Sequence, residues 1–111
     1  MADTRWVKEF PGAVTVCDPD GIILDMNDKA IAIEGGKTYV GSNLLDCHPE
    51  PARSQVAELL KTRQAILYTA EKQGKKTLVY ATPWFIDGVY SGIMDLVIDL
   101  PGTLPHVRRK S

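Results

Sequence analysis

The stretch from residue 13 to residue 30, AVTVCDPDGIILDMNDKA, constrains the fold more than any other part of the chain. Residues 13–17 and 22–26 are apolar runs, rich in β-branched side chains, that have the length of β-strands. The Asp-Pro-Asp-Gly between them favours a tight turn, because proline fixes φ, glycine supplies a positive φ and aspartate bonds local backbone. Asn27 is then a suitable N-cap. The stretch therefore predicts a hairpin that leads directly into a helix.

The remaining pattern predicts further helices followed by antiparallel strands. We expect helices within residues 4–11, 27–34 and 49–63, with one helical turn at 43–46. Both Pro49 and Pro51 would fall in the first turn of the longest helix, where proline is tolerated. We expect three more strands over 66–72, 76–85 and 89–100, joined by Gln73-Gly74-Lys75 and Asp87-Gly88. Such short connections make these strands antiparallel hairpins.

Composition bounds the class of protein. The 111 residues suffice for one domain, and 44% hydrophobic with 24% charged residues is ordinary for a soluble globular protein. A net charge of −1 gives no sign of the positive surface that would bind nucleic acid or an anionic membrane. No apolar stretch reaches the roughly 20 residues of a membrane span, and no signal-peptide core is present. Cys17 and Cys47 lack metal-type spacing, which indicates free thiols and a cytoplasmic location.

The element order, the D-x-x-G turn with Asn27, and the later Gly41-Ser42-Asn43-Leu44-Leu45 together resemble PAS domains, the small sensor modules of signalling proteins. The resemblance covers almost the entire chain. It implies an α+β fold, a five-stranded antiparallel sheet with helices packed on one face. It divides the chain into an N-terminal helical and dimerisation segment (1–12), the PAS domain (13–101) and a tail (102–111). We expect a free-standing bacterial-type PAS protein, with a fragment of a larger signalling protein as the alternative.

The facing of the last strand has two interpretations. Simple alternation would turn the cleaner apolar set, Met94, Leu96 and Ile98, toward the core. The PAS resemblance instead implies that Val97 points at a ligand, as the equivalent position does in flavin-binding relatives. Between the strands 76–85 and 89–100, a two-residue Asp-Gly turn would pair odd-numbered residues of one strand with even-numbered residues of the other. A three-residue loop with a bulge would pair odd-numbered residues with odd-numbered ones. We follow the PAS resemblance and expect Val97 to face the ligand.

The candidate binding site lies between the sheet and the longest helix. His48 is a polar anchor at its mouth or, alternatively, a residue that caps the helix and packs. In the family's register Asp95 faces the same cavity, and a buried carboxylate needs a partner, either His48 or a bound ligand. In the other register Asp95 faces solvent. The predicted site residues are Cys47, His48, Val56, Leu60, Val79, Ala81, Asp95 and Val97.

No cofactor is identified by these residues, and no metal motif or catalytic set is predicted. Cysteinyl-flavin photoreceptors of this family carry a cysteine where Leu44 stands and a glutamine where Val97 stands, which counts against flavin photochemistry. The family's haem ligand usually lies within the helix, whereas His48 precedes it. An enzyme would depend on Cys47, His48 and Asp95 alone, so we expect none.

The face of the sheet away from the helices is too apolar to be bare in water. Because PAS domains commonly dimerise through this face with their N-terminal helix, the resemblance implies a homodimer; cover from within the chain is the alternative. The residues predicted at this interface are Trp6, Phe10, Tyr80, Trp84, Met94, Leu96 and Ile98.

The sequence thus predicts a sensor that binds a small, largely apolar ligand between sheet and helix and signals through dimer or partner contacts. The alternatives are a ligand-free dimerisation or protein-interaction module and, second, a haem-binding PAS sensor. A signalling partner protein is possible, and no nucleic-acid or membrane partner is expected.

Overall fold

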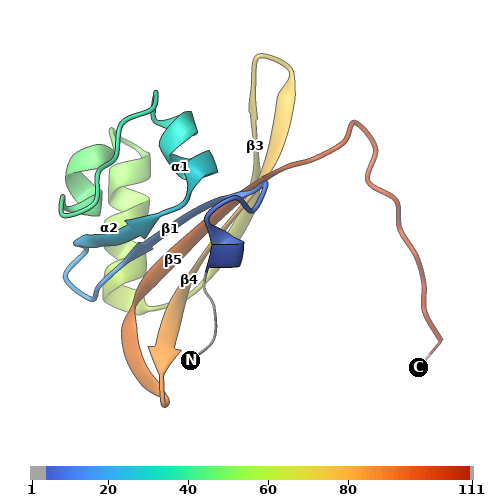
Figure 1. Ribbon diagram of the computed structural model, residues 1–111. Coiled ribbons are helices and arrows are strands. Elements are labelled where there is room, and N and C mark those ends of the chain that lie inside the picture. The colour runs from blue at the N-terminus through green and yellow to red at the C-terminus, as the bar shows by residue number, and fades with distance from the viewer. Residues whose placement is uncertain (1–4, 111) are drawn as a thin grey trace.

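A computed structural model describes residues 5–110 of the chain, apart from the side chain of Cys47. It confirms the predicted α+β architecture, with a five-stranded antiparallel sheet in the order β2-β1-β5-β4-β3 and both α-helices on one face (Figure 1). The strands are β1 (Ala13–Cys17), β2 (Ile23–Met26), β3 (Ile66–Lys72), β4 (Lys75–Ile86) and β5 (Val89–Asp99). The helices are η1 (Arg5–Val7), α1 (Asp28–Ile33), η2 (Leu44–Cys47) and α2 (Ala52–Thr62), where η denotes a 3-10 turn.

The opening turn forms as the sequence predicts. The Oδ1 atom of Asp18 accepts hydrogen bonds from the backbone N–H groups of Asp20 and Ile22, both at 2.9 Å. The N–H of Gly21 donates to the Asp18 carbonyl at 3.0 Å, and Gly21 has a φ of 89°. Ile22 does not belong to β2, because it forms an isolated bridge with Asn43. A side chain thus specifies this turn together with proline and glycine.

Asn27 is confirmed as the N-cap of α1 and also holds two other segments. Its Oδ1 accepts from the backbone N–H of Ala30 at 3.1 Å and of Val14 at 2.9 Å. Its Nδ2 donates to the carbonyls of Val7 at 3.0 Å and Gly12 at 2.8 Å. The residue is buried, so these bonds replace its bonds to water. One amide therefore ties α1, β1 and the segment after η1 together.

Two predicted helices are shorter in the structure. The helix within residues 4–11 is reduced to η1, and residue 4 lies outside the described residues. The long helix begins at Ala52 instead of residue 49, with Pro51 as its N-cap. A proline disfavours helical backbone at the residue before it, and His48, which precedes Pro49, is accordingly extended. Because of these two closely spaced prolines, the helix begins only at the residue after Pro51.

Both hairpins of the last three strands close with two-residue turns. Lys72 pairs with Lys75 across Gln73-Gly74, so the predicted three-residue connection is wrong. Ile86 pairs with Val89 across Asp87-Gly88, as one of the two interpretations assumed.

A bulge next to the second turn decides which side of β5 faces the helices. Phe85 pairs with Tyr90, but Trp84 pairs with Gly92, so Ser91 is an extra residue in β5. Beyond the bulge odd residues pair with odd ones, such as Ala81 with Asp95. Ile93 is accordingly 2% exposed beneath the helices. The family's register is therefore confirmed, and simple alternation, which would bury Met94, Leu96 and Ile98, is wrong.

Gly92 allows β5 to pass close to β1 at this bulge. Its φ is +133°, and a Cβ atom there would lie 1.8 Å from the Cys17 carbonyl oxygen. The same oxygen accepts a hydrogen bond from Nε1 of Trp84 at 3.0 Å. Only a residue without a side chain leaves room for this approach.

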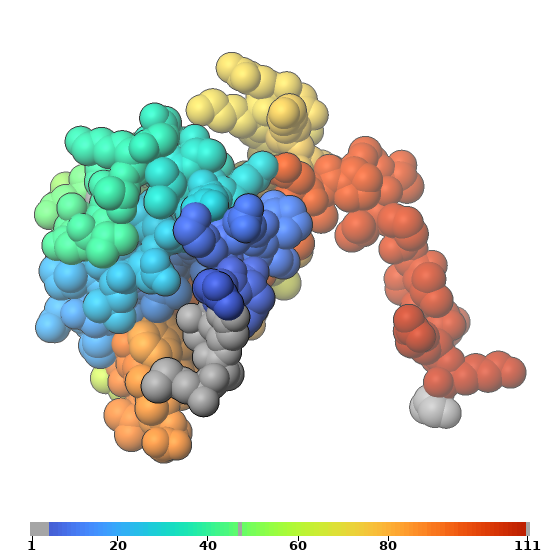
Figure 2. All heavy atoms as spheres, viewed as in Figure 1, coloured from blue at the N-terminus to red at the C-terminus, as the bar shows by residue number. Residues whose placement is uncertain are grey.

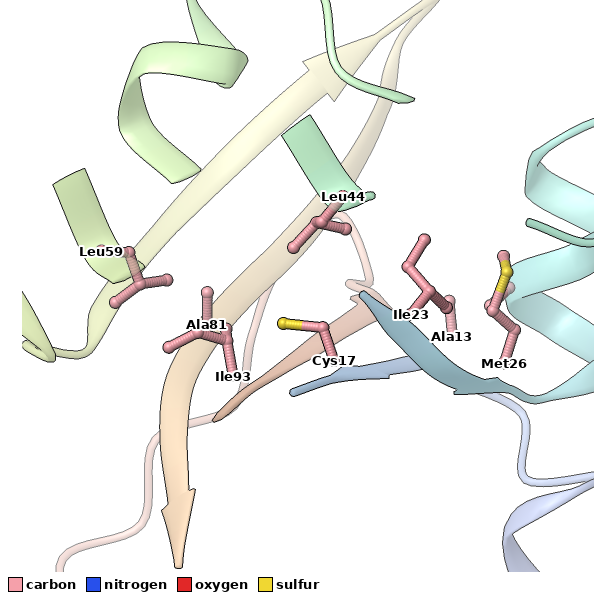
Figure 3. Close-up of a cluster of buried hydrophobic side chains, with 9 residues drawn as sticks. Ala13, Cys17, Ile23, Met26, Leu44, Leu59, Ala81 and Ile93 are labelled. Carbon is pink, nitrogen blue, oxygen red and sulfur yellow. The ribbon is translucent and has the colours of Figure 1, made fainter. Parts of the chain in front are cut away.

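The core fills the space between the sheet and the helices (Figure 3). Cys17 is a buried free thiol at its centre, beside Ile93. None of the helices within residues 5–110 is long and apolar enough to cross a membrane. Residues 101–110 are exposed and extend away from the body of the domain (Figure 2). The buried apolar residues are Ala13, Cys17, Ile23, Met26, Ala30, Leu44, Leu59, Ala81 and Ile93.

We expect the substitution Gly92→Ala to destabilise the domain by about 3 kcal/mol or more, because the methyl group collides with backbone that cannot move aside. Gly88→Ala is the matched control: its φ is also positive, but its Cβ would meet nothing within 4 Å. It should cost about 1 kcal/mol. Urea unfolding followed by tryptophan fluorescence measures both, and equal losses would contradict the role given to Gly92.

Candidate functional site

A small cavity of about 50 Å³ lies between the sheet and α2. Its walls are mostly apolar, and five of the predicted site residues are among them: His48, Val56, Val79, Ala81 and Asp95. The other lining residues are Leu44, Ala52, Gln55, Leu59, Ile66, Tyr68 and Ile93.

The remaining three predicted residues lie elsewhere. Val97 lines a neighbouring cavity under α1, also of about 50 Å³. Leu60 is not among the residues that line these cavities, because it packs beside Gly21 of the opening turn. Leu59, one residue earlier on α2, faces the cavity in its place. The side chain of Cys47 is outside the part of the chain that the structure describes.

Asp95 is the central polar group. It lines three adjoining cavities, under α2, under α1 and beside η2. Its neighbours across the sheet are Thr15 on β1 and Ala81 on β4. Burial raises the pKa of the Asp95 carboxyl, and nearby His48 opposes part of this rise. Within residues 5–110 no hydrogen bond or ion pair to this carboxyl is found.

His48 is positioned by the turn before α2. Asn43 caps η2 by accepting from the N–H of Leu45 at 2.9 Å, and His48 follows as the C-cap residue. Its Nδ1 lies 2.8 Å from the carbonyl oxygen of Leu44. A carbonyl oxygen can only accept, so Nδ1 carries the hydrogen of this bond, and Nε2 forms no hydrogen bond within the described residues. His48 shares two cavities with Asp95 but forms no described hydrogen bond with it.

Tyr68 is a site residue that the sequence did not reveal. It lies on β3 opposite Val79 and lines the cavity under α2. Burial, with the charge of Asp95 as a second cause, raises the pKa of its phenol, which keeps the hydroxyl protonated. Thr15 was also missed. Pairing outward from Asp95 would have found Thr15, and pairing outward from Val97 through Val79 would have found Tyr68, but only once the register was known.

A wider, open groove of about 680 Å³ runs between α2 and β3. It shares Gln55, Leu59, Ile66 and Tyr68 with the inner cavity, so these side chains separate the cavity from solvent. A small molecule could enter by this route.

The described polar groups of the cavity can accept and donate hydrogen bonds. Within the part of the chain that the structure describes, no three His, Cys, Asp or Glu side chains gather closely enough to hold a metal ion. The site as described is therefore suited to binding a small molecule.

The fold matches solved PAS structures. The PAS domain of Bordetella pertussis BvgS is 20% identical, with a TM-score of 0.69 over 86% of this chain and 81% of that one. The PAS domain of histidine kinase ThkA is 16% identical, with a TM-score of 0.66 over 81% and 100%. A C-terminal domain from Streptococcus mutans is 26% identical, with a TM-score of 0.66 over 84% and 78%. No family model and no curated protein sequence matches the chain.

We expect Asp95→Asn to raise the free energy of unfolding at neutral pH. Because the folded-state pKa of this carboxyl is raised, its ionisation destabilises the folded state above the ordinary carboxyl pKa. The gain should shrink as pH falls through the raised pKa and should vanish below the ordinary carboxyl pKa of 3.8, where both states are protonated.

Urea unfolding of both proteins at pH 4 and pH 7.5, chosen around the ordinary carboxyl range, measures this effect. Asp99→Asn is the control, since Asp99 is exposed and lies 3.7 Å from Lys29. A gain for Asp95→Asn that is the same at both pH values would contradict the assignment.

Proposed function

The chain has the PAS fold, and on that premise we propose that it is a sensor module that binds a small, largely apolar ligand between the sheet and α2. The observation that carries the proposal is the apolar cavity with Asp95 and His48 in its wall. A ligand there would touch α2, β4 and β5 at once. Its presence would therefore alter how the helix packs on the sheet.

The structural neighbours support a sensing role. One is the PAS domain of a histidine kinase, and another is the sensor region of a sensor histidine kinase, of which this chain covers 38%. At 16% and 18% identity these likenesses establish the fold, so sensing by this chain is part of the proposal.

The cavity sets the size of the ligand. A water molecule needs about 10–15 Å³ of such volume, so about 50 Å³ admits a ligand of only a few heavy atoms. Haem does not fit, because cofactor pockets are roughly 300–1,000 Å³. This disfavours the haem-binding alternative, even though Nε2 of His48 is free.

The outer face of the sheet is proposed as a homodimer interface. Beyond the bulge this face carries Tyr80, Trp84, Met94, Leu96 and Ile98 side by side on β4 and β5. Phe10 and Ile98 both lie over Gly12, so the N-terminal segment covers one end of the face. Trp6 remains 73% exposed, and a second copy would bury it together with the rest of the face.

A ligand-free dimerisation module is the second candidate. The small volume of the cavity favours it, because side chains already fill most of the space between sheet and helix.

Native mass spectrometry of freshly purified protein separates these two functions. We expect an added mass that disappears on denaturation. Ala81→Val should abolish it, because the added methyl groups fill the cavity wall at a stability cost of about 1–3 kcal/mol. Thr82→Val, the neighbouring position on the outer face, is the control and should retain the mass. Wild-type protein that carries no added mass would favour the dimerisation module.

Leu96→Arg should convert the dimer into a folded monomer, because it places a charge at the centre of the outer face. Sedimentation velocity measures the change. Ala57→Arg on the exposed side of α2 is the control and should remain dimeric. A wild-type monomer would overturn the interface.

A further inference from the structure

The carboxyl of Asp95 lies where the three cavities beneath the helices meet. Across the part of the chain that the structure describes, no side chain or backbone group is seen to hydrogen-bond it, and the residue is half-buried. A carboxylate that is partly removed from water costs the protein free energy unless hydrogen bonds compensate. A bound group with N–H donors would supply such hydrogen bonds.

The surroundings of Asp95 favour one kind of charge. None of the residues that line the three cavities is lysine or arginine, whereas Glu34 lines two of them with Asp95. His48 is the one basic side chain among the described residues that line these cavities, and its Nδ1 is already bonded to the Leu44 carbonyl. Most of the walls are aliphatic, so the field of these groups is weakly screened. The cavity therefore attracts a cation and repels an anion.

We infer that the ligand of this cavity carries a positively charged N–H head group, of the amidinium or ammonium class, that binds the carboxylate of Asp95. The inference rests on the proposed function, a ligand held between the sheet and α2, and replaces its largely apolar character by a charged head group with a short apolar part. A flat amidinium offers two parallel N–H donors, which suit the two oxygens of a carboxylate. The aliphatic walls leave room for a short apolar substituent only.

Three molecules of the same shape test the charge directly: acetamidinium, acetamide and acetate, each with four heavy atoms. The experiment is a titration of the ¹⁵N-labelled full chain with each, followed by ¹H–¹⁵N NMR. We expect acetamidinium to bind at least about tenfold more tightly than acetamide, since a hydrogen bond to a charged group contributes more. Acetate should not bind. The shifted amides should lie around Thr15, Ala81 and Asp95.

Asp95→Asn should reduce the preference for acetamidinium to within about twofold, because it keeps the shape and removes the charge. Asp99→Asn is the matched control: it removes a carboxylate four residues further along β5, at an exposed position, and should leave the preference intact. A preference that survives in Asp95→Asn would overturn the inference.

Failure of this inference is distinguishable from failure of the proposed function. Equal binding of acetamidinium and acetamide would overturn the cationic head group and leave the sensor pocket standing. No binding of any probe, while native mass spectrometry shows a co-purifying ligand, would do the same. Selective binding of acetamidinium to a chain that purifies bare would support the inference, and would show that the cavity accepts a ligand which purification removes.

Discussion

The extra residue in β5 is the constraint on which the rest of the structure depends. Side chains alternate along a strand, so one inserted residue exchanges the two faces of everything beyond it. In this chain Ser91 is that residue, and Gly92 makes the bulge possible by leaving room for the Cys17 carbonyl. Without the bulge, Asp95 would face away from the helices and Met94 would take a place in the core. The cavity and the outer face both follow from this local feature.

Asn27 is a second constraint, because its side chain joins three separate segments of the chain. Asn27 begins α1, bonds the backbone of β1 and holds the carbonyls of the N-terminal segment, all through one buried side chain. The N-terminal segment, which reaches the outer face of the sheet, is thereby linked to α1, which packs on the inner face. A change in the packing of α1 on the sheet can therefore reach the N-terminal segment through the hydrogen bonds of one side chain.

The sequence predicts what is decided locally and misses what is decided at a distance. The Asp18 turn, the Asn27 cap and the five strands depend on neighbouring residues, and all are confirmed. The register of β5 depends on Gly92 meeting the Cys17 carbonyl, which no local pattern shows. Asp95 could be placed toward the helices because the PAS resemblance supplied that register, whereas His48 was chosen for its position before the long helix. Leu59 and Tyr68 required the rotation of α2 and the pairing of β3, which only the structure gives.

The burial of Asp95 links stability to binding. Its ionised form destabilises the folded domain, because the cavity offers no described hydrogen bond or neighbouring lysine or arginine. A cation bound there would remove that cost and stabilise the domain by an amount that grows with its concentration. Asp95 lies between β1 and β4 at the centre of the sheet, and α2 covers it. The charge of Asp95 can therefore select the ligand. It can also make the packing of α2 on the sheet depend on whether that ligand is bound.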